Sequence, residues 1–175
     1  MNDFYVRKEN KIAKVALIIL IFSAIFWLGA LNVRDIITNE IMIMEKLEFR
    51  PNINPMVERS VMSLIAKSST VVLGSYLLVW ISGVIYLWKT NLVLKKNGWL
   101  LMSAILFYIF TPVEIYTGFL DGKMIYLDYF TQGDFVEFRK LLVHRIAALS
   151  GASRIAQLCY YTIIVITVLQ PFKKN

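Results

Sequence analysis

The chain has 175 residues, of which 58% are hydrophobic and 18% are charged, and its formal net charge at pH 7 is +7. Soluble domains are about 45–50% apolar and about 25% charged, so this composition excludes an ordinary soluble protein. The single cysteine, Cys159, excludes an internal disulfide and a metal site built from several cysteines.

Four long apolar stretches follow one another along the chain, and only the third contains a charged residue, Glu114. A hydrocarbon core of about 30 Å needs about 20 helical residues, and backbone groups in lipid must pair within the helix. We therefore predict an all-α integral membrane protein, a single domain of four transmembrane helices in a bundle. The predicted spans cover residues 15–33, 68–88, 97–120 and 155–172.

The first stretch follows a basic segment, residues 6–14, and could for that reason be a cleaved signal peptide. Its apolar run is longer than the usual signal-peptide core of about 7–15 residues, and no clear small-residue cleavage site follows it. We expect it to remain in the protein as a membrane anchor.

Lysine and arginine are concentrated in three short segments, 1–14, 89–96 and 171–175. Basic residues in short segments near the ends of spans mark the cytoplasmic side. We therefore expect both termini to be cytoplasmic, in the plasma (inner) membrane, with segments 34–67 and 121–154 on the other side. The net positive charge then reflects topology and attraction to anionic lipid head groups, not nucleic-acid binding.

Two helices are predicted to be longer than the membrane is thick. Asn54 and Pro55 provide an N-cap and a first helical residue for a helix over 55–88. Asp134 provides an N-cap for a continuous helix over 134–170. Each of these helices would project about 20 Å beyond a membrane core of about 30 Å.

The outer segments are predicted to form a helical extracytoplasmic head from the ends of helices 1, 2 and 4. Apolar residues recur at helical spacing over 33–47, before Pro51 interrupts the pattern. Asp121 and Gly122 predict a turn after the third span. The apolar segment 124–130 would then be either a cap on the bundle or a lid over a pocket.

Small residues recur along the second and fourth helices at spacings that favour close helix–helix contact. We interpret both stripes as seams inside the bundle or as an interface with another membrane subunit or a second copy of the chain. The residues are Ser68, Ser75, Ser82 and Gly83 in the second helix, and Ala148, Ala152 and Ala156 in the fourth.

Glu114 is an ionisable residue near the outer end of the third span, which makes it a functional candidate by default. An ion pair with Arg145, Arg154 or Lys67 would also explain it. His144 is the single histidine and could act as a base or orient a quinone. No metal site or cofactor is predicted, and a bound lipid or quinone is left open. The candidate ligand-binding residues are Glu114, Tyr116, His144, Arg145 and Arg154.

Three functions are compatible with these features. The first is a non-catalytic accessory or structural subunit of a larger membrane complex. The second is a binder or transporter of a lipophilic or anionic small molecule at an outer-leaflet pocket. The third is a membrane enzyme at the outer interface, with His144 as its base. The sequence favours the first, since it contains no catalytic or nucleotide-binding motif.

Overall fold

A computed structural model describes residues 10–131 and 134–173 and is almost entirely helical. Four helices are long and apolar enough to cross a membrane, as the sequence predicts. They cover Lys11–Ile41, Pro55–Lys89, Gly98–Phe130 and Ala152–Leu169, the third with a break inside it.

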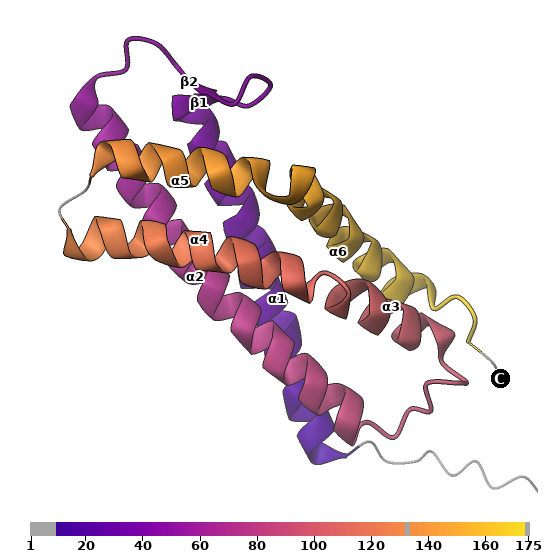
Figure 1. Cartoon of the computed structure of the whole chain (residues 1–175). Coiled ribbons are helices and arrows are strands. Elements are labelled where there is room, and N and C mark those ends of the chain that lie inside the picture. The colour runs from indigo at the N-terminus through magenta and orange to yellow at the C-terminus, as the bar shows by residue number, and fades with distance from the viewer. Residues whose placement is uncertain (1–9, 132–133, 174–175) are drawn as a thin grey trace, which may run out of the picture.

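The two longest helices, α1 (Lys11–Ile41) and α2 (Pro55–Lys89), form an antiparallel pair along most of their length (Figure 1). The Asn54 side chain accepts a hydrogen bond from the Met56 N–H at the start of α2, so the predicted cap is confirmed. The helices have 31 and 35 residues, or about 46 and 52 Å at 1.5 Å per residue. Both therefore exceed a hydrocarbon core of about 30 Å.

A short hairpin, β1 (Met42–Ile43) and β2 (Glu48–Phe49), connects α1 to α2. The helical pattern expected over 33–47 therefore ends at Ile41. Met42 still donates its backbone N–H to Thr38 of α1, but its extended backbone turns the chain back. Met42 pairs with Phe49 in the hairpin, and both side chains cover the same buried cluster.

The third span is bent. It consists of α3 (Gly98–Tyr108) and α4 (Thr111–Phe130), and the break falls just before Pro112, which has no N–H to continue the helix. The turn predicted at Asp121 and Gly122 is wrong, because both residues lie inside α4. The segment predicted as a cap or lid is the end of the same helix.

The continuous helix predicted over 134–170 is also wrong. Asp134 caps α5 (Phe135–Ala147) as expected, but a 3-10 turn, η1 (Ala148–Gly151), separates α5 from α6 (Ala152–Leu169). Leu149 and Gly151 have left-handed backbones, with φ of 53° and 82°, and this bends the helical path. Figure 1 shows that α5 turns away from α6 to lie beside α4.

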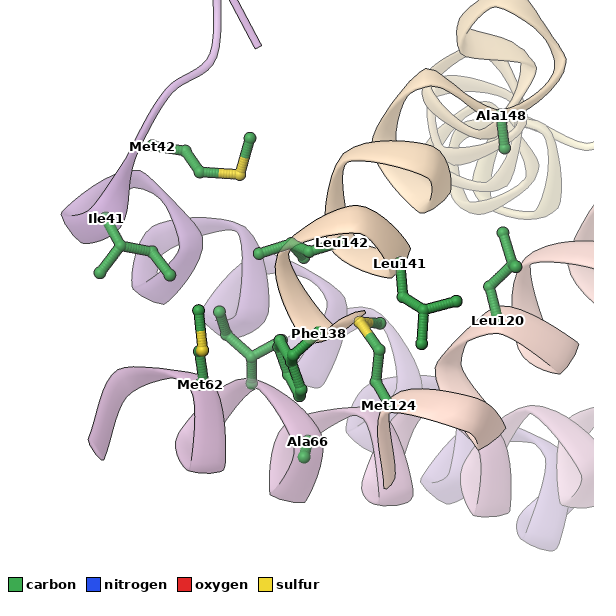
Figure 2. Packing of buried hydrophobic residues seen from close by; sticks show 11 residues of the cluster. Ile41, Met42, Met62, Ala66, Leu120, Met124, Phe138, Leu141, Leu142 and Ala148 are labelled. Atoms are coloured by element: carbon green, nitrogen blue, oxygen red, sulfur yellow. The ribbon is translucent and has the colours of Figure 1, made fainter. Parts of the chain in front are cut away.

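Buried side chains form three clusters along the molecule. The cluster at the hairpin end joins α1, α2, α4 and α5 through residues such as Met62, Met124, Phe138 and Leu142 (Figure 2). Helix α4, the second half of the third span, thus contributes to this end. The sequence had predicted a head built only from the ends of the first, second and fourth predicted helices. We call the hairpin end the distal end.

The opposite end, which we call the basic end, contains the start of α1, the 90–97 loop and the end of α6. One cluster there joins Ala13 and Ala16 of α1 with Tyr86 of α2 and Leu100 of α3. An isolated β-bridge places Lys173 beside the 90–97 loop. The described parts of the three segments predicted to share one side of the membrane, residues 10–14, 89–96 and 171–173, therefore share one end of the molecule.

Candidate functional site

A buried ion-pair network joins α1, α4 and α5. Asp121 of α4 receives one guanidinium on each carboxylate oxygen, Arg34 of α1 at 2.8 Å and Arg145 of α5 at 3.0 Å. The three side chains are 2%, 3% and 11% exposed, respectively. Charges buried to this degree are costly unless they are paired, and here the pairing links three separate helices.

Arg34 has more hydrogen-bond donors than partners. Its Nη1 atom donates to Asp121 and lies 3.4 Å from Ser69 Oγ. Its Nε and Nη2 atoms are buried and have no hydrogen-bond partner among residues 10–131 and 134–173. A buried donor without a partner costs about 1–3 kcal/mol, so this guanidinium has an unmet demand for an acceptor.

Arg34 lines a small cavity between α1, α4, α5 and α6. The cavity has a volume of about 20 Å³, which is enough for one water molecule or one ligand oxygen atom but not for a ring. We call the charged and amide side chains that line this cavity, together with Asp121 beside it, the charged layer. The charged and amide side chains that line the cavity are those of Arg34, Asp35, Glu114, Arg145, Arg154 and Gln157.

Polar side chains close the cavity between α1 and α6. Arg154 of α6 forms an ion pair with Asp35 of α1, and the Arg154 side chain is 50% exposed. Gln157 donates to Asn32, and Asn32 donates to Tyr161 at 2.6 Å. We call these five residues the α1/α6 portal. Its contacts are polar and partly exposed, beside the buried apolar cluster of Trp27, Leu31, Ala156 and Tyr160.

Glu114 lies in the first turn of α4 and accepts a hydrogen bond from Tyr160 of α6 at 2.9 Å. Tyr160 packs in turn on Trp27 of α1, with ring centroids 4.6 Å apart. In the described part of the chain Glu114 forms no ion pair within 4.0 Å, so the pairing considered from the sequence is replaced by a tyrosine contact.

The structure brings together three of the five candidate ligand-binding residues, because Glu114, Arg145 and Arg154 line the same cavity. Tyr116 and His144 do not line it. They are exposed and contact each other between α4 and α5, with 2.9 Å from Tyr116 Oη to His144 Nε2. A role for His144 as a base stays a prediction.

Sequence reasoning missed Arg34, Asp35 and Asp121. The available signal was the adjacent Arg34–Asp35 pair at the end of an apolar span, since ionisable residues in or beside a span are functional candidates. Asp121 was taken for a turn residue because glycine follows it, and its partners are distant in the sequence.

Most of the small-residue stripes are buried in contacts within this chain. Ser68 Oγ donates to the Ala30 carbonyl of α1. A Cβ added at Gly83 would lie 2.7 Å from Tyr108 Oη of α3. The remaining stripe residues are buried, except Ala152, which is half-buried, and they are Ser75, Ser82, Ala148, Ala152 and Ala156. These placements favour seams within the chain.

Comparison of the chain with protein-family models, curated proteins and solved structures gave no match.

Proposed function

We propose that this protein is an integral membrane protein that binds an amphiphile with one negative charge, taking its head group into the charged layer through the α1/α6 portal. The observation that carries this proposal is the buried Arg34 guanidinium. Its Nε and Nη2 atoms have no partner in the described chain, and the residue lines a cavity shared with Arg145 and Arg154.

The proposed topology places the charged layer near the outer boundary of the membrane. With the basic end in the cytoplasm, α6 runs from Leu169 on the inner side to Arg154 on the outer side. These residues are about 22 Å apart along the helix axis. In a plasma membrane, the distal end would then form the extracytoplasmic head of a four-helix bundle.

The charges of the layer favour a single negative charge on the ligand. In the closed structure Asp35 holds Arg154, and Asp35 is partly exposed, so it can turn to water. A ligand carboxylate that replaced it would face three guanidinium groups and the carboxylates of Asp121 and Glu114. Three guanidinium groups outnumber these two carboxylates, so the layer keeps a net positive charge of at least one for the ligand to neutralise.

The size and surroundings of the cavity favour an amphiphile over a free ion or a whole quinone. The cavity accepts only a head-group oxygen, so the rest of the ligand must lie outside it. Large apolar side chains flank the portal, and each of them is at least half exposed. They are Val33 and Ile36 on α1 and Ile155 and Leu158 on α6. They can line the path of an alkyl chain in the membrane.

The test compares a long-chain fatty acid with the alcohol of the same chain length, titrated calorimetrically into the purified chain in a neutral detergent. We expect the carboxylate to bind at least about tenfold more tightly than the alcohol, because only the carboxylate pairs with the arginines. Arg154→Gln should weaken binding of the carboxylate. Arg139→Gln, which removes an arginine paired with Glu58 outside the layer, is the matched control.

Asp35→Asn separates ligand binding from a merely structural role of the layer. If Asp35 competes with the ligand for Arg154, its neutralisation should tighten carboxylate binding about threefold, the range of a partly exposed ion pair. Equal affinities for acid and alcohol, or weaker acid binding by Asp35→Asn in a folded protein, would contradict the proposal.

A second candidate function, an accessory subunit of a membrane complex, is favoured by the surface of the distal end. Met56 of α2, Phe130 of α4 and Val136 of α5 are 80%, 74% and 62% exposed there. In the proposed topology these side chains lie beyond the hydrocarbon core, where apolar surface indicates an interaction site. Native mass spectrometry of the protein, extracted gently from its own membrane, should show heavier species that Met56→Asp dissociates.

A further inference from the structure

An open apolar groove of about 410 Å³ lies between α1 and α2 near the basic end, away from the charged layer. Its floor contains two small buried residues, Ala16 and Ser82. Its walls include Val15 and Ile81, which are about half exposed. Lys11 closes one end of the groove. Its volume falls within the range of about 300–1,000 Å³ that is typical of ligand sites.

Among the residues that the structure describes, the charges around the end of this groove have one sign. The basic end carries lysines on α1, on α2 and in the adjoining segments, namely Lys11, Lys14, Lys89, Lys95, Lys96 and Lys173. The described segments 10–16, 85–97 and 170–173, which make up this end, contain no aspartate or glutamate. An anionic group that approaches the groove therefore meets no opposing carboxylate from these segments.

We propose that the groove holds one acyl chain of an anionic phospholipid, with the phosphate group at Lys11. From Lys11 to Ile19 the groove follows α1 for about 12 Å. This length accommodates the first part of an acyl chain, counted from the head group. Small residues on the floor let the chain lie between the helices, and the lysine pairs with the phosphate. Basic sites between transmembrane helices on the cytoplasmic side recognise anionic lipids in this way.

Native mass spectrometry of the full chain in detergent tests this site, with phosphatidylglycerol and phosphatidylcholine of identical acyl chains added in competition. We expect the wild type to retain phosphatidylglycerol in preference to phosphatidylcholine. Lys11→Gln should lower that preference about fivefold, the contribution of one lysine near an anionic head group. Lys95→Gln removes a lysine charge from the same end of the molecule but outside the groove. It should change the preference for phosphatidylglycerol by less than about twofold.

A second pair of variants tests the groove itself. Ile81→Trp should fill the groove from its wall and abolish retention of both lipids. Val84→Trp places the same side chain on α2 at a residue that is also exposed but does not line the groove. This variant should retain both lipids. Equal retention of the two lipids by the wild type, or equal effects of the two tryptophans, would refute the proposal. A wild-type dimer that Ile81→Trp dissociates would assign the groove to a second copy instead.

The groove and the charged layer share no lining residue, so the two proposals fail independently. Loss of fatty-acid binding in Arg154→Gln leaves the phospholipid site untouched. Loss of phosphatidylglycerol in Lys11→Gln likewise says nothing about the α1/α6 portal.

Discussion

Arg34 of α1 and Asp121 of α4 form an ion pair of 2.8 Å in which both side chains are almost completely buried. Arg145 occupies the other oxygen of the same carboxylate, so one aspartate pairs with two arginines from different helices. This arrangement makes Asp121 the charge on which the contact between α1, α4 and α5 depends.

Asp121→Asn should therefore destabilise the protein by about 3–5 kcal/mol, because it leaves two buried guanidinium groups without a counter-charge. The free energy of unfolding in mixed micelles measures the loss. The double variant Arg34→Met with Asp121→Asn should be more stable than Asp121→Asn alone, since one of the uncompensated charges is gone. A double variant that is no more stable than the single one would show that Arg34 and Asp121 are not coupled.

Gly83→Ala should destabilise the contact of α2 with α3 by about 1–3 kcal/mol, the usual cost of overpacking. An added Cβ would lie 2.7 Å from Tyr108 Oη, whereas an added Cβ at Gly74 meets no atom within 4 Å. Gly74→Ala is thus the matched control on the same helix and should be neutral or stabilising by up to about 1 kcal/mol. Tyr108→Phe should recover the stability of Gly83→Ala, and a lack of recovery would argue against this steric origin.

The bend between α5 and α6 depends on the left-handed backbone of Gly151. Gly151→Ala should cost about 1 kcal/mol of stability, because φ of 82° is unfavourable for a residue with a Cβ, even though space around it is open. Gly122→Ala, inside α4 and equally unobstructed, should instead stabilise by about 0.5–1 kcal/mol. Thermal unfolding of both variants decides the matter. Equal effects would mean that residue 151 does not need the left-handed conformation.

The two ends of the molecule should face opposite sides of the membrane. In a Cys159→Ser background, Val136→Cys should react with a membrane-impermeant maleimide in intact cells. Lys95→Cys should react only after the membrane has been opened, because the basic residues of the 90–97 loop favour the cytoplasm. The reverse labelling pattern would invert the proposed topology, and labelling of both sites in intact cells would argue against a membrane-spanning fold.

Local signals in the sequence predicted the spans and the helix starts, since Asn54 and Asp134 cap helices through their own neighbours. The break at Leu149 and Gly151 was not predictable in this way, because alanine-rich flanks favour a continuous helix. Its position depends on where α5 packs against α4. The bend before Pro112 was not predicted, although this proline stands inside the predicted third span and proline interrupts helices.

The candidate site was predicted only in part, because some of its residues have a local sequence signal and others depend on distant partners. Glu114 and Arg154 stand out as charges near the predicted outer ends of spans, so their sequence positions put them at one depth. Arg145 lies well before the predicted fourth span and joins them because α5 bends away from α6 to lie beside α4. The importance of Arg34 comes from its partner Asp121 and from donors that stay unpaired, and neither property is encoded near Arg34 itself.

The Arg34–Asp121 pair also sets an order of events during biosynthesis. The two residues are 87 positions apart, so the ribosome delivers Arg34 into the nascent α1–α2 hairpin long before its counter-charge exists. Until α4 and α5 are made, the arginine must reach toward the membrane surface. Completion of the charged layer is therefore a late step that follows the synthesis of α4 and α5.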